Sequence, residues 1–120
     1  MLSRVAESLY WMSRYIERAE NVARLLDIGL YLELDAAELG GAHGLAPVEI
    51  ALTILACRDA FPVEQGRPPR DAVLRFLTFD RSNPQSILSM IARTRENARG
   101  TQETIGVDVW SEVNRLYLFL

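Results

Sequence analysis

Residues 2–34, LSRVAESLYWMSRYIERAENVARLLDIGLYLEL, decide the fold that this sequence predicts. Apolar side chains recur there at alternating spacings of three and four, the heptad pattern of a helix that packs against other helices. A proline-free helix over about residues 3–39 would be roughly 55 Å long, and so long an amphipathic helix needs helical neighbours to cover its apolar face. The expected contact face comprises Leu2, Val5, Leu9, Met12, Ile16, Ala19, Ala23, Leu26 and Leu30.

A second long helix is expected over about residues 84–105. Asn83 and Pro84 are typical of a helix start, with Asn as the N-cap and Pro as the first helical residue. Heptad spacing continues from there, and Gly106 is expected to end the helix.

The rest of the chain predicts shorter helices over residues 48–58, 70–78 and 109–120. No segment alternates polar and apolar residues for long enough to indicate a sheet. The sequence therefore predicts an all-α helical bundle with two long helices, about 3–39 and 84–105, plus shorter helices, in a single domain over residues 1–120.

Composition excludes several functions. The net charge of −3 gives no excess of basic residues for nucleic acid or anionic lipid. No apolar stretch approaches the roughly 20 residues that span a bilayer, and the N-terminus lacks the pattern of a signal peptide, so a cytoplasmic protein is expected. All thirteen basic residues are Arg, which suits bidentate recognition of carboxylate or phosphate but also fits a simple composition bias.

The chain has one cysteine and one histidine. Cys57 follows an apolar run typical of a buried position, and His43 lies among glycines. We therefore expect neither a thiolate or histidine metal site nor a cofactor, and no Cys-His or Ser-His catalytic pair.

Three polar clusters could carry a function. The first lies in the middle of the first long helix, the second in the middle of the second long helix, and the third in the turn before the second. Their members are Arg14, Glu17, Arg18, Glu20, Asn21 and Arg24, then Arg95, Glu96, Asn97 and Arg99, then Asp80, Arg81 and Asn83.

These clusters have several possible interpretations. They can be solvated faces with ordinary ion pairs, or a buried network that fixes the register of the two long helices. They can also form a ligand site, in which Arg beside Glu and Asn holds a carboxylate such as a peptide end. A di-metal carboxylate site is disfavoured because no Glu-x-x-His motif is present. The turn residues can simply cap the following helix, or the helix N-terminus can bind an anion.

Three ordered motifs resemble the bacterial alpha-E family, an all-helical domain of unknown function named for a Glu-Arg motif. They are MLSRVAESLYW with RYIERAEN (residues 1–11 and 14–21), FDRSNPQS (79–86), and RENAR with WSEVN (95–99 and 110–114). The resemblance covers nearly the whole chain and transfers the motif positions Glu17, Arg18, Glu20, Asn21, Asp80, Arg81, Asn83, Arg95, Glu96, Asn97 and Arg99.

What the resemblance implies is a context rather than an activity. Alpha-E proteins typically occur with a permuted ATP-grasp amide ligase and a transglutaminase-like protease, which suggests synthesis or modification of a peptide. Family members are usually longer, so we expect this chain to be the N-terminal part of a longer alpha-E protein.

We therefore expect a non-catalytic binding or scaffold protein that works with a peptide ligase and forms a homo-oligomer. The apolar segment 116–120 also favours self-association. One alternative is an enzyme of peptide or amide chemistry with Glu17, Glu20 and Glu96 as acid–base groups. Another is a carboxylate metal-binding bundle. All three interpretations need the polar middles of the two long helices to meet.

Overall fold

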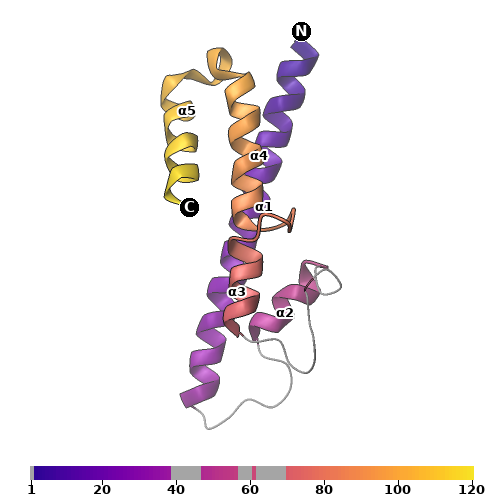
Figure 1. The fold of residues 1–120 in the computed structure, drawn as a ribbon, viewed down its shortest axis with the longest axis vertical. Helices are drawn as coiled ribbons and strands as arrows, with labels where there is room; N and C mark the ends of the chain where they lie inside the picture. Colours follow the sequence, from indigo (N-terminus) through magenta and orange to yellow (C-terminus); the bar gives the residue numbers. More distant parts are fainter. Residues whose placement is uncertain (1, 39–46, 57–60, 62–69) are drawn as a thin grey trace.

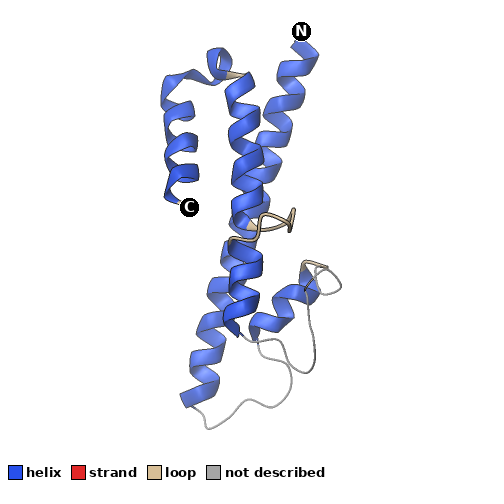
Figure 2. Cartoon of the chain, in the orientation of Figure 1, coloured by secondary structure: helices blue, strands red, loops and turns tan. Residues whose placement is uncertain are grey.

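The fold is known from a computed structural model that describes residues 2–38, 47–56, 61 and 70–120. Every regular element in this part of the chain is a helix (Figure 2), which confirms the all-α prediction. The helices are α1 (Leu2–Glu38), α2 (Pro47–Ile54), α3 (Arg70–Thr78), α4 (Ile87–Gly100) and α5 (Gln102–Phe119). The expectations for His43, Cys57 and the end of the first helix beyond Glu38 lie outside the described residues.

The long helix α1 is the element against which the others are arranged (Figure 1). It packs against α4 along its N-terminal half and against α2 and α3 toward its C-terminal end, while α5 folds back along α4. The result is elongated, with extents of 57 × 27 × 22 Å. No helix in the described ranges is both long and apolar enough to cross a membrane.

Three apolar clusters hold the helices together. The largest joins the C-terminal half of α1 to α2 and α3, and the two smaller clusters join α1 to α4 and α5. Their buried members are Val22, Leu26, Ala51, Leu52, Phe61, Val73, Phe76 and Leu77, then Ala19, Met90 and Ile91, then Met12, Ala98 and Val113.

The contact face of α1 differs in part from the predicted one. Ile16 is 39% exposed and Ala23 is also exposed, whereas Tyr15 is half-buried and Val22 only 2% exposed. Positions 12, 15, 19, 22 and 26 satisfy the same three-and-four alternation as the predicted set. Both sets were available in the sequence, and the neighbouring helices cover the one that buries Val22.

The second long helix is shorter than predicted, which corrects the range 84–105. The N-cap of α4 is Ser86, whose hydroxyl oxygen accepts a hydrogen bond from the Ser89 backbone N–H at 3.1 Å. At the other end, Thr101 leaves the helical conformation, and its hydroxyl donates to the Asn97 carbonyl at 2.9 Å. Because the turn before Ser86 has its own hydrogen bonds, Asn83 does not start the helix.

Gly106 does interrupt the helical path, as predicted, but within α5. Its φ of 87° and ψ of 164° are not helical, and few residues other than glycine adopt them. The residues before and after it are helical, so α5 consists of a short first turn and a longer segment that packs on α4.

Candidate functional site

A hollow of about 500 Å³ lies where α1, the end of α2 and the beginning of α4 meet. We call it the arginine groove. It brings together two members of the α1 polar cluster, Arg18 and Asn21, with Arg93 of α4. The groove is lined by Arg18, Asn21, Val22, Ile54, Leu55, Pro84, Gln85, Met90 and Arg93.

The helical periodicity of α1 and α4 places these polar groups at the edge of their contact. Ala19 and Val22 are buried, and Arg18 and Asn21, each one position earlier, are exposed beside them. On α4, Met90 is buried and Arg93 follows one turn later at the surface. The floor of the groove is therefore apolar and its rim carries guanidinium and amide groups.

Arg93 lines this groove and belongs to none of the three polar clusters predicted from the sequence. Its guanidinium lies over the ring of Tyr15, 5.6 Å from the centroid. It also lines two neighbouring hollows, one shared with Arg81 and Ser82 and the other with Tyr15, Glu96 and Asn97. The signal that could have found it is its spacing of three residues from the apolar Met90 position.

Three arginines of this surface have no carboxylate within ion-pair distance in the part of the chain that the structure describes. They are Arg18, Arg81 and Arg93. The groove, with Arg18 and Arg93, and the hollow that Arg93 shares with Arg81 thus concentrate unpaired positive charge on a protein whose net charge is −3. Such guanidinium groups are suited to bind an anion through paired hydrogen bonds.

The other α1 arginines of the polar cluster differ, because each meets a carboxylate on its own helix. Arg14 lies 4.0 Å from Glu17, and Arg24 donates to Glu20. On α4, Arg99 lies 3.6 Å from Glu96. These are exposed pairs of the kind that contributes a few tenths of a kcal/mol.

The three glutamates proposed as acid–base groups are solvated. The Glu17 and Glu96 side chains are 65% and 64% exposed, and Glu20 is exposed as well. Neither Glu17 nor Glu20 lines the arginine groove or the two hollows that Arg93 shares with it. This arrangement gives the catalytic alternative no support, since a general acid or base normally lies in a shielded cleft.

The metal alternative also finds no support. Among the described residues, no group of three or more His, Cys, Asp or Glu side chains is placed to hold a metal ion.

One member of the second polar cluster, Arg95, attaches α5 to α4. The half-buried Arg95 donates from Nε to Oδ1 of Asn114 at 2.8 Å and lies 4.5 Å from the centroid of the Tyr117 ring. Asn97 donates to the backbone carbonyl of Arg93 at 3.0 Å. Arg95 therefore fixes the register of α4 with α5, whereas one interpretation of the sequence was a network between the two long helices.

The turn between α3 and α4 is held by its own side chains. Asp80 accepts hydrogen bonds from the Ser82 hydroxyl at 2.6 Å and from the Ser82 N–H at 2.9 Å. These bonds, the hydroxyl one first, lower the pKa of the Asp80 carboxyl below its usual value. Arg81, which lies between Asp80 and Ser82 in the turn, is exposed and available to a ligand.

Asn83 is a structural residue of this turn. It is 3% exposed, donates from Nδ2 to the Phe76 carbonyl at 3.2 Å, and accepts from the Gln85 N–H at 3.0 Å. It thereby connects the end of α3 to the residues that border the arginine groove.

A family model described as a predicted alpha-helical domain with a conserved ER motif matches residues 1–120. The sequence contains one Glu-Arg pair, Glu17-Arg18, and its arginine lines the groove. No curated protein and no solved structure is significantly similar to the chain.

Proposed function

The chain belongs to the Alpha-E family, and on that premise we propose that it is a non-catalytic binding protein whose arginine groove holds a carboxylate group of a peptide. One observation carries the proposal. Arg18 of α1 and Arg93 of α4 line the same hollow, and neither has a carboxylate partner within the described ranges.

The groove has the chemistry that a carboxylate requires. Two guanidinium groups supply charge and directed donors, and the amides of Asn21 and Gln85 can donate further hydrogen bonds. The apolar side chains of Val22, Ile54 and Met90 exclude water from one side, which strengthens these bonds. The volume of about 500 Å³ lies within the range of small-molecule and peptide-end sites.

The wider context that we propose comes from the family resemblance. The peptide would be a substrate or product of an ATP-grasp amide ligase or a transglutaminase-like protease in the cytoplasm. The chain would act as the N-terminal part of a longer protein and would self-associate. Leu116, Leu118 and Phe119 of α5 are exposed and support self-association.

The test of the groove is the affinity for a fluorescein-labelled triglutamate peptide, measured by fluorescence anisotropy. Arg18→Gln and Arg93→Gln should each weaken binding about tenfold or more, because each removes a charge-assisted pair of hydrogen bonds. Arg14→Gln on α1 and Arg115→Gln on α5 are matched controls, since both arginines are exposed and lie outside the groove.

The controls should change the affinity less than twofold. Equal losses in all four variants would show that the peptide responds only to overall charge and would contradict the proposal. The proposed association with the ligase is tested separately, by co-purification of the two proteins. A second readout is the ligase's rate of amide formation with and without this protein.

A further inference from the structure

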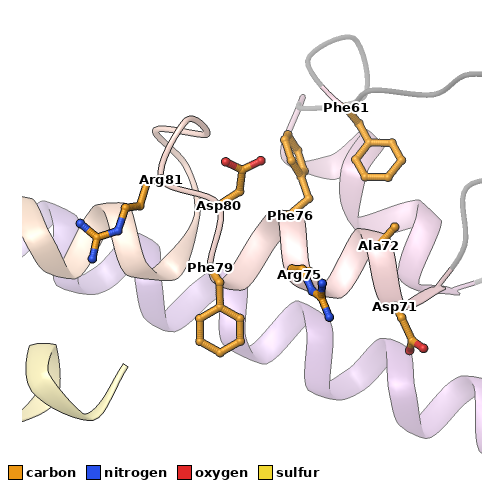
Figure 3. Close-up of a pocket in the computed structure, with 8 residues that line it drawn as sticks. All are labelled: Phe61, Asp71, Ala72, Arg75, Phe76, Phe79, Asp80 and Arg81. Atoms are coloured by element: carbon orange, nitrogen blue, oxygen red, sulfur yellow. The ribbon is translucent and has the colours of Figure 1, made fainter.

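A second hollow of about 720 Å³ lies over α3, on the other side of the turn that borders the arginine groove. We call it the aromatic hollow (Figure 3). Carbon atoms make up most of its wall, and the side chains that matter to its chemistry are Phe61, Phe76, Phe79, Arg75 and Arg81.

The aromatic side chains provide a rigid interior and an exposed rim. Phe61 and Phe76 are buried and meet edge to face, with ring centroids 5.1 Å apart and an interplanar angle of 76°. Phe79 directly follows the last residue of α3, one turn beyond Arg75, and is 49% exposed. Figure 3 shows Phe79 and Arg75 pointing to the same side of the helix. A half-exposed ring at the mouth of an apolar hollow is a surface that a second apolar side chain can cover.

The charged groups of this hollow favour a ligand that carries a negative charge beside its apolar side chain. Arg75 and Arg81 have no carboxylate within ion-pair distance among the residues described. The carboxylate of Asp80 is already bonded to Ser82, and Asp71 lies in the first turn of α3, where the helix dipole stabilises a negative charge. The two arginines are therefore the groups left to bind a ligand.

The aromatic hollow and the arginine groove are connected through shared residues. Arg81 lines the aromatic hollow and also the hollow that contains Arg93. Arg93 in turn lines the arginine groove with Arg18. A series of guanidinium groups thus passes around the turn from one site to the other.

From this arrangement we infer that the aromatic hollow binds a large apolar side chain of the peptide whose carboxylates lie on the arginines. The substrate class is an extended acidic peptide with an aromatic residue beside its carboxylates. This inference rests on the proposed function and deepens it, because it names the residue that follows the acidic segment.

The experiment compares two labelled peptides, triglutamate followed by phenylalanine and triglutamate followed by alanine, by fluorescence anisotropy. The wild-type protein should bind the phenylalanine peptide roughly ten to a hundred times more tightly, the value expected for burying one aromatic side chain. Phe79→Ala should abolish most of this preference and leave the affinity for the alanine peptide unchanged. Phe119→Ala, an exposed phenylalanine on α5, is the matched control and should keep the preference.

Equal affinity of the wild type for the two peptides, or a preference that survives Phe79→Ala, would overturn this inference. If the alanine peptide still binds through Arg18 and Arg93, the proposed function stands without it. If neither peptide binds, both proposals fail. Tight binding of 3-phenylpropionate alone would show that the occupant is a small aromatic acid and not a peptide. Circular dichroism confirms that each variant is folded.

Discussion

Asn83 gives the sharpest test of how the turn between α3 and α4 supports the site. Its side chain is almost completely buried and makes two hydrogen bonds, to the Phe76 carbonyl and from the Gln85 N–H. Asn83→Ala removes both and leaves two backbone groups without a partner. Each net bond contributes about 1 kcal/mol, and a buried unsatisfied group adds to the cost, so the free energy of unfolding should fall by about 2 to 3 kcal/mol.

The assay is urea unfolding followed by circular dichroism. With a slope of about 2 kcal/mol per M, the midpoint should fall by roughly 1 M. Asn97→Ala is the matched control: the Asn97 side chain donates to a backbone carbonyl of its own helix, α4, at 3.0 Å, and alanine favours the helix. Its effect should stay within about 0.5 kcal/mol. If Asn83→Ala were as stable as the control but lost peptide binding, Asn83 would be a ligand-binding residue and its structural role would be refuted.

Three further predictions concern the turn and α5. Asp80→Ala should lower the unfolding free energy by about 0.5 to 1 kcal/mol at pH 7, because it removes the bonds from Ser82. The pKa of Asp80 is lower in the folded state than its usual value of 3.8, so the ionised carboxylate stabilises the fold above pH 3.8. This stabilisation is lost as the pH falls through the lowered pKa. In acid unfolding curves, the stabilities of the wild type and the variant should therefore converge below that pH. Gly106→Ala should cost about 1 to 2 kcal/mol in thermal unfolding, because alanine resists the positive φ. Gly100→Ala, equally open but without that φ, should stabilise by about 0.5 kcal/mol, and equal effects at both glycines would contradict the assignment. Asn114→Ala removes the hydrogen bond that joins α5 to α4, and hydrogen exchange should speed up in α5 while that of α4 is unchanged.

The sequence predicts those features of the fold that depend on local pattern. The heptad spacing of residues 2–34 is enough to predict a long packed helix, and Gly106 is enough to predict an interruption. It does not decide which of two adjacent heptad faces is buried, because Ile16 and Tyr15 are both large and apolar enough to occupy the interface. The helices that pack on α1, mainly α4 and α2, make that choice.

The sequence predicts only part of the candidate site, because it does not show which helices pack beside each polar cluster. Arg18 and Asn21 were recognised, and the structure places them in a groove. One interpretation of the sequence places Arg95 in a network between the two long helices, but α5 folds back along α4 and Arg95 bonds Asn114 of α5 instead. Arg93 belongs to none of the predicted clusters. Its spacing of three residues from Met90 places it beside the contact face of α4, but only the packing of α4 on α1 brings it into the same groove as Arg18.

The most direct test of the central claim observes the arginine side chains themselves. In ¹H–¹⁵N spectra of the Nε groups, assigned with single Arg→Lys variants, triglutamate peptide is added stepwise. If the arginine groove binds the carboxylates, the signals of Arg18 and Arg93 should shift together with one saturating curve, while those of Arg14 and Arg115 barely move. Shifts of similar size in all four signals, or none in the first two, would contradict it.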